Sequence, residues 1–141
     1  MGQLEFDDLP EQSLVLMDSA PIIYFLESHR EYAYRFRPLF EAHAAGRLRF
    51  AVSTIAVAEV LTGPMQAKDD VLARRYRVIL ESWNPIALDV DIAENAARLR
   101  ASLRLKLADA VQVASALAVN AAALVTHDRD FSRVRGLRII S

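Results

Sequence analysis

The segment LVLMDSAPIIYFL, residues 14–26, joins a short apolar run to a helix start and contains one charged residue, Asp18. Residues 14–17 are uninterrupted and apolar, which is typical of a parallel strand buried on both faces. Ser19 is a candidate N-cap and Pro21 falls within the first turn, so a helix is predicted to follow. Asp18 therefore lies where a buried strand gives way to a helix. An ionised carboxylate in such surroundings is costly unless it lies at a rim or a cation pairs with it.

Outward from this segment, the order of strand and helix repeats along the chain. Further strands are predicted at residues 47–53, 85–90, 123–126 and 137–140. Helices are predicted at residues 31–46, 54–63, 67–83, 91–106 and 107–122, the second of these closed by Gly63 and Pro64, and residues 127–136 are predicted to be a loop. Alternating strands and helices imply crossover connections. The predicted fold is therefore α/β, a three-layer α/β/α sandwich with a mostly parallel central sheet.

The bulk composition indicates one soluble domain. The chain has 141 residues, a net charge of -1 and no cysteine, which excludes disulfides and thiolate metal sites and gives no bulk signal for nucleic acid. No apolar run approaches the length of a membrane span, and the acidic N-terminal segment does not resemble a signal peptide. We expect a cytoplasmic protein without membrane association, with a polar arm over residues 1–13 and one folded domain over residues 14–141.

Four acids interrupt four different apolar segments: Asp18, Glu59, Asp109 and Asp128. Asp18 and Asp128 follow predicted strands, at the sheet edge where open α/β folds place their ligand crevice. Glu59 and Asp109 lie on helices that could lean over that edge. Like charges gathered closely cannot all stay ionised unless a cation joins them. Carboxylate oxygens favour Mg²⁺ or Mn²⁺, and such a site supports hydrolysis of phosphodiester bonds.

Three of the four acids also have an ordinary structural explanation. Asp18 may be read as an N-cap, Asp109 gains from the helix dipole in a first turn, and Asp128 could be a solvated loop residue. Glu59 has no capping role, because it lies within a helix among apolar neighbours. The combined pattern, rather than any single acid, favours a metal site.

Four ordered motifs resemble one known family: VLMDSAPIIYFLE (residues 15–27), VSTIAVAEVLTGP (52–64), LADAVQVASALA (107–118) and LVTHDRDF (124–131). They are similar to the PIN-domain ribonucleases, in particular the VapC-type toxins of bacterial toxin–antitoxin pairs. The resemblance covers residues 14–141 and implies an endoribonuclease that depends on Mg²⁺ or Mn²⁺. It also implies a homodimer and inhibition by a cognate antitoxin protein whose tail occupies the active-site groove.

By position, the resemblance assigns the catalytic and metal-binding roles to Asp18, Glu59, Asp109 and Asp128. Ser19 and Thr126 match hydroxyl residues that would orient ligands or water, although capping and turn bonding explain them equally well. Three features depart from the family pattern. The N-terminal arm is longer than usual, an alanine precedes Asp109 where proline is common, and Asp130 competes with Asp128 for the role of fourth acid.

Weaker signals and rival functions complete the prediction. The basic residues near Asp109 and Asp128 could contact RNA phosphates or form a solvated face; they are Arg98, Arg100, Arg104, Lys106, Arg129, Arg133 and Arg135. The aromatic residues Tyr24, Phe25, Tyr32 and Phe36 are predicted to be core or dimer contacts rather than base-stacking groups. A receiver domain lacks its expected acidic pair and late lysine, and no glycine-rich nucleotide loop can be built. A catalytically silent PIN-like protein-interaction module is the remaining alternative.

Overall fold

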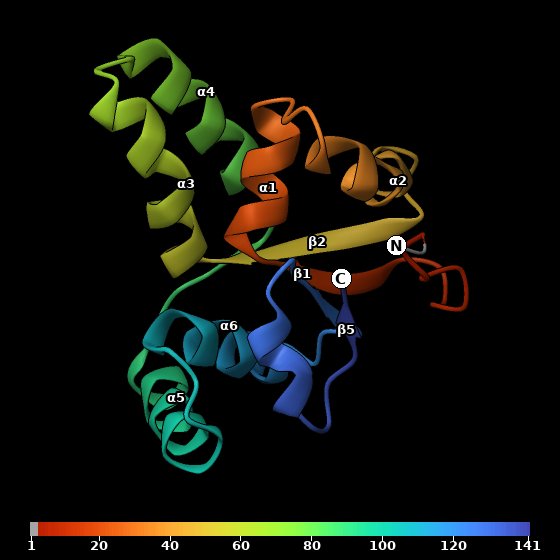
Figure 1. Cartoon of the computed structure of the whole chain (residues 1–141), viewed down its shortest axis with the longest axis vertical. Coiled ribbons are helices and arrows are strands. Elements are labelled where there is room, and N and C mark those ends of the chain that lie inside the picture. The colour runs from red at the N-terminus through yellow and green to blue at the C-terminus, as the bar shows by residue number, and fades with distance from the viewer. Residues whose placement is uncertain (1–2) are drawn as a thin grey trace.

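A parallel sheet with strand order β3-β2-β1-β4-β5 forms the middle layer of the computed structural model, which describes residues 3–141 (Figure 1). Its strands are β1 (Ser13–Met17), β2 (Leu48–Ser53), β3 (Pro85–Ile86), β4 (Ala123–Val125) and β5 (Ile139–Ile140). In register, Val15 of β1 lies between Phe50 of β2 and Ala123 of β4. The predicted parallel sheet is confirmed, with the segment that follows the N-terminal arm at its centre.

Helices cover both faces of the sheet (Figure 1). One face carries α1 (Ser19–Leu26), α2 (Tyr32–Ala44), α3 (Thr54–Gln66) and α4 (Asp70–Glu81), and the other carries α5 (Val90–Leu103) and α6 (Leu107–Ala118). Side chains alternate along β1, so Val15 and Met17 pack in the core beneath α1–α4 while Leu16 packs in the core beneath α5 and α6. Because both faces are covered, β1 is apolar from Leu14 to Met17. The α/β/α sandwich is therefore confirmed.

Several predicted boundaries are wrong by a few residues. Helix α3 does not close at Gly63 and Pro64 but continues to Gln66, with Pro64 buried inside the helix; Lys68, with φ of 56°, follows its end. The strand predicted over residues 85–90 ends at Ile86, because Asp89 caps α5 by accepting the Ile92 N–H at 2.8 Å. The loop predicted over residues 127–136 contains a 3₁₀ turn, η1 (Arg129–Arg133).

The N-terminal arm is irregular over residues 3–12 and packs against the domain. Phe6 and Leu9 are buried in the same core as β1, and the Arg47 guanidinium donates hydrogen bonds to the carbonyls of Asp7, Leu9 and Pro10. Residues 1 and 2 of the predicted arm lie outside the described residues, and Ser13 belongs to β1. Among the described residues, no helix has the length and apolarity to cross a membrane.

The strand order creates a topological switch at β1. The chain runs from β1 to β2 and β3 on one side, then crosses the other face through α5 and α6 to reach β4 and β5. In such sheets the connections diverge beside the first strand and leave a crevice at the carboxyl ends. The residues that follow β1 and β4 therefore meet at this edge.

Candidate metal centre

Asp18 follows β1 and caps α1, so its carboxylate is fixed at the carboxyl edge of the sheet. Its Oδ1 accepts the backbone N–H of Ser19 at 2.8 Å and the side-chain amide N–H of Gln112 at 3.1 Å. Its Oδ2 accepts the Thr126 hydroxyl at 2.8 Å. The residue is only 8% exposed. The N-cap of α1 is therefore Asp18 and not the predicted Ser19. Asp18 both caps this helix and presents a buried carboxylate at the candidate site.

Burial raises the pKa of Asp18, and the negative charge of Asp128 raises it further. The hydrogen bonds from Thr126, Ser19 and Gln112 act in the opposite direction, because they stabilise the ionised carboxylate. The net pKa lies above the ordinary value for aspartate. Asp18 is thus an orientated carboxylate whose ionised form still lacks sufficient stabilisation from protein donors.

The loop after β4 places Asp128 near Asp18 and carries a further acid, Asp130. The Asp128 backbone N–H donates to the Thr126 hydroxyl at 3.0 Å, and the Asp128 Oδ1 accepts the Asp130 N–H at 2.8 Å. Thr126 therefore connects the loop to Asp18, because its hydroxyl donates to the Asp18 carboxylate and accepts the Asp128 N–H. This local turn fixes the Asp128 side chain.

Asp109 lies in the first turn of α6 and is 9% exposed. Its Oδ2 is buried and has no hydrogen-bond partner among the described residues. Burial raises the pKa of Asp109 to about 6, and the charges of Asp128, Asp18 and Asp130 contribute in that order, against a smaller lowering by Lys106. A buried carboxylate oxygen without a donor, facing other acids, is costly unless a cation occupies the position.

Asp109, Asp128 and Asp130 each place one carboxylate oxygen within 4.8 Å of the others. A donor set made only of carboxylate oxygens fits a hard divalent cation such as Mg²⁺ or Mn²⁺. The unpartnered Oδ2 of Asp109 supplies the observation that such an ion would explain. Asp18 lies outside this group of three but is joined to it through Thr126.

Glu59 lies apart from that group of three acids. It is an exposed residue of α3, and its side chain hydrogen-bonds Ser19, the neighbour of Asp18. Burial of the carboxyl raises the pKa of Glu59 and the Asp18 charge raises it further, while the Ser19 hydrogen bond lowers it. Glu59 therefore borders the site on the side of Asp18, through Ser19.

Gln112 was not predicted from the sequence, although it connects three elements at the site. It is 1% exposed; its Oε1 accepts the Ser53 hydroxyl at 2.9 Å, and its Nε2 donates to Asp18. Ser53 in turn caps α3 by accepting the Ala56 N–H at 3.2 Å. A signal was present, because Gln112 is the single amide of α6, whose one charged residue is Asp109, and it stands three residues after Asp109 on the same face.

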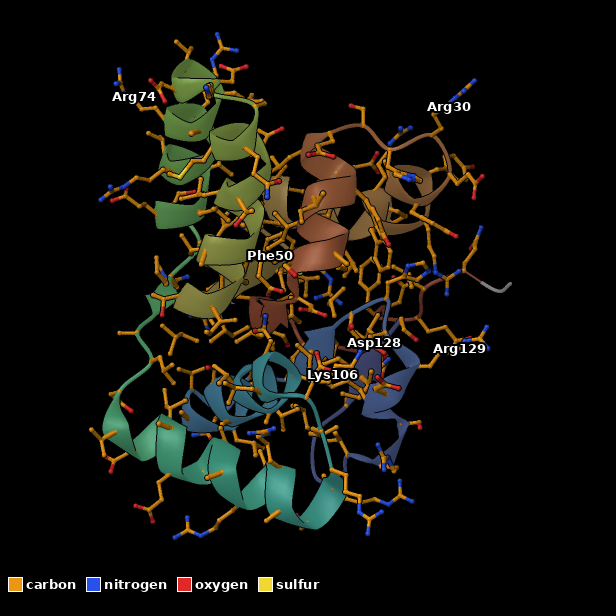
Figure 2. All side chains as sticks on the ribbon, turned by 60° about the vertical axis from the view of Figure 1, so that its left-hand side comes forward. Arg30, Phe50, Arg74, Lys106, Asp128 and Arg129 are labelled. Carbon is orange, nitrogen blue, oxygen red and sulfur yellow. The ribbon has the colours of Figure 1, made fainter. Side chains whose placement is uncertain are left out.

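One basic residue, Lys106, lies beside the acids; Figure 2 shows it near Asp128, whereas the Arg129 side chain extends outward. The Lys106 ammonium is 3.9 Å from the Asp130 carboxylate, and both side chains are well exposed. Arg98, from the same predicted group of basic residues, instead pairs with Glu94 along α5. Lys106 thus borders the acids, and Arg129 directly follows Asp128 in the chain.

Comparison with known proteins finds one matching family model and several similar solved structures. A family model described as PIN domain matches residues 15–137. A toxin–antitoxin complex from Klebsiella pneumoniae is 28% identical with a TM-score of 0.71, over 90% of this chain and 96% of that chain. VapBC2 from Rickettsia felis, bound to a DNA fragment from its promoter, is 20% identical with a TM-score of 0.70, over 89% and 96%. Comparison with curated proteins gives no significant match.

Proposed function

This chain belongs to the PIN-domain family, and from that premise we propose that it is a metal-dependent endoribonuclease and the toxin of a type II toxin–antitoxin pair. The observation that supports the proposal most strongly is the buried, unpartnered Oδ2 of Asp109 among neighbouring carboxylates. Protein donors reach both oxygens of Asp18, whereas the Oδ2 of Asp109 has no hydrogen-bond partner among the described residues, so a cation is the partner that the arrangement lacks.

In this proposal Asp109 and Asp128 bind Mg²⁺ or Mn²⁺ together with Asp18, and Glu59 completes the acidic set from α3. When bound, the cation would stabilise the charge on the scissile phosphate and lower the pKa of the attacking water. Thr126 and Gln112 hold Asp18 in one orientation by donating to its two oxygens. One of the four carboxylates accepts the proton of the attacking water.

The proposed substrate is single-stranded or looped RNA, because its phosphates can approach acids that lie at an open sheet edge. Lys106 borders those acids and Arg129 directly follows Asp128, so the two cations would contact phosphates on either side of the cleaved bond. The proposed site is thus negative at its centre and positive at its border.

The proposed partners are a cognate antitoxin and a second copy of the chain, in the cytoplasm. The antitoxin is supported by the Klebsiella pneumoniae relative, which was solved as a toxin–antitoxin complex and matches nearly all of this chain. A small neighbouring reading frame with a DNA-binding half is the expected genetic counterpart. The homodimer is proposed from the family resemblance.

A catalytically silent interaction module is the less favoured alternative. Such a module would gain nothing from a buried carboxylate oxygen without a donor, and the repulsion among Asp109, Asp128 and Asp18 would only lower its stability. The acids are therefore better explained by cation binding than by structural support.

Cleavage of purified total RNA tests the proposed activity. We expect cleavage by the wild type with Mn²⁺, none after addition of EDTA, and loss of cleavage in Asp18→Asn and Asp109→Asn. Asp91→Asn is the matched control, because Asp91 is an exposed acid in the first turn of α5, away from the site. Equal cleavage by all three variants would refute the assignment of the acids.

A further inference from the structure

Five aromatic rings from four segments of the chain gather beside the acids. We call them the ring cluster, and its members are Tyr24 from α1, His29 from the turn after it, Tyr32 and Phe36 from α2, and His127 from the loop after β4. His127 immediately precedes Asp128. The ring cluster is therefore joined through the backbone to the acidic site.

The rings are in mutual contact. Tyr24 lies with its ring centroid 5.0 Å from Tyr32 and 5.4 Å from His127, and Tyr32 lies 4.5 Å from His127. His29 stacks on Tyr32 with centroids 5.0 Å apart and an interplanar angle of 17°. These distances are those of favourable aromatic pairs. The stack extends from His127 outward to His29.

Exposure increases along the ring cluster. Phe36 is fully buried, so its predicted role in the core is confirmed. Tyr24, Tyr32 and His127 are half-buried, and His29 is exposed. A cluster that served only the core would be buried throughout, as are Phe40 and Phe50 on the same face of the sheet. The outer rings therefore present aromatic surface to solvent beside the site.

Hydrogen bonds hold the outer rings in place. The His29 Nδ1 accepts the backbone N–H of Glu31 at 3.2 Å and of Tyr32 at 3.3 Å. The Tyr24 hydroxyl is hydrogen-bonded to the His127 Nδ1 at 3.0 Å. Rings that are already fixed lose little conformational entropy when a ligand stacks on them. Such rigid aromatic surfaces bind flat ligands efficiently.

The charges around the ring cluster suit a nucleic acid. Burial lowers the pKa of His127, and the positive charges of Arg35 and Arg129 lower it further, so both arginines lie near this ring. Burial raises the pKa of the Tyr24 hydroxyl, and Tyr32 and the negative charge of Asp18 raise it further, so Asp18 also lies near the ring cluster. Aromatic surface, positive charge and the acidic site thus lie side by side.

We propose that the ring cluster is a base-stacking subsite, in which Tyr32 and His29 receive an unpaired nucleobase next to the cleaved phosphate. The proposal rests on the proposed RNA substrate and goes beyond it, because it assigns a base-binding role to residues outside the acidic set. Stacking of bases on aromatic side chains tolerates any sequence, since every base has a π-face. The ring cluster would therefore favour single-stranded over fully paired RNA.

Fluorescence of 2-aminopurine in a single-stranded RNA oligonucleotide tests the proposal directly. The full-length protein is titrated into this RNA with Ca²⁺, a hard cation of the same ligand class, and stacking is read as quenching while anisotropy reports binding. We expect quenching by the wild type. In the double variant His29→Ala/Tyr32→Leu, quenching should be lost and binding weakened about tenfold, while the salt dependence from phosphate contacts stays the same.

Two controls separate stacking from general effects. Tyr32→Phe keeps the ring and should quench like the wild type. Tyr34→Leu removes a tyrosine of the same helix that is 75% exposed and lies outside the ring cluster, and it should also leave quenching unchanged. If Tyr32→Leu prevents folding, as judged by thermal melting, His29→Ala alone provides the test because His29 is exposed.

The outcomes distinguish the subsite from the activity itself. Wild-type cleavage of the same RNA with Mn²⁺, together with full quenching by the double variant, would overturn the subsite and leave the nuclease intact. Loss of self-association in the double variant with unchanged RNA binding would also overturn it, because the rings would then form a protein contact. A wild type that neither binds nor cleaves RNA would overturn the proposed function, and the subsite with it.

Discussion

At the scale of single residues, the Asp109 carboxyl combines burial, an unpaired oxygen and neighbouring negative charge. The folded protein therefore binds a proton at this group more tightly than the unfolded chain does. A bound divalent cation would remove the same cost by a different route, since it neutralises the charge that the proton would otherwise neutralise. Proton and cation should thus compete for the site.

Asp109→Asn should change how stability depends on pH in the metal-free protein. The pKa of Asp109 is raised from 3.8 to about 6 on folding, so this group lowers the free energy of unfolding as pH rises through that interval, with no further change above it. Asparagine removes this dependence. In EDTA, the melting temperature of the variant relative to that of the wild type should therefore increase between pH 3.8 and pH 6. If the melting temperatures of the two proteins change by the same amount with pH across that interval, the raised pKa assigned to Asp109 is wrong.

Asp128 and Asp130 should contribute unequally to metal binding. The Asp128 side chain is fixed by the Asp130 N–H, whereas the side chain of Asp130 is 50% exposed and already faces Lys106. Asp128→Asn should therefore weaken Mn²⁺ binding more than Asp130→Asn in calorimetric titrations. The reverse order would identify Asp130 as the fourth acid.

At the scale of elements, α6 connects the acids to the segments that follow β1 and β2. Its first turn carries Asp109, and one turn later Gln112 donates to Asp18 while accepting from Ser53 at the start of α3. The orientation of Asp18 thus depends on contacts from two helices. This explains how elements far apart in the sequence hold one site together.

Gln112→Leu should weaken Mn²⁺ binding by about tenfold to a hundredfold, because groups that orient metal ligands typically contribute this much. Leucine keeps the buried volume but cannot donate to Asp18. Ser115→Ala is the matched control, since Ser115 is equally buried on α6 and its hydroxyl has no hydrogen-bond partner among the described residues. Equal affinities for both variants, by calorimetry, would show that Gln112 only fills space.

Sequence patterns predicted these elements better than their ends. The apolar run of residues 14–17 in β1 and the nearly uncharged sequence of α6 reflect burial, which the composition of a segment records directly. The end of α3 was predicted wrongly because it depends on burial of Pro64, a tertiary contact that local turn preferences cannot include. Gln112 was missed for a similar reason, since its partners Asp18 and Ser53 are distant in the sequence.

At the scale of the whole molecule, the parallel strand order brings the ends of β1 and β4 together. Asp18 and Asp128 could be predicted to meet because carboxyl ends of adjacent parallel strands share one edge. Three features could not be predicted from the sequence. Asp130 lies close to Asp109 and Asp128, Glu59 borders the site through Ser19, and Thr126 connects Asp18 to Asp128. Each depends on contacts that exist only in the folded protein. The sequence thus predicts at which edge of the sheet the candidate site lies, and the structure adds how the acids are arranged there.

The N-terminal arm should stabilise the whole domain. Phe6 is buried in the core that also contains Val15 and Met17, so Phe6→Ala should lower the free energy of unfolding by about 3 kcal/mol. Urea denaturation measures this change, with the exposed Tyr34→Ala as a control that should have little effect. An unchanged midpoint for Phe6→Ala would mean that the arm is an independent appendage.

Anomalous diffraction from crystals soaked in Mn²⁺ tests the central claim most directly, namely that carboxylates distant in the sequence share a divalent cation at one edge of the sheet. We predict an anomalous peak within bonding distance of the Asp109 Oδ2 and of an Asp128 oxygen, and no such peak in Asp109→Asn crystals. Crystals in which Mn²⁺ binds elsewhere, or in which the wild-type acids bind none, would contradict the account.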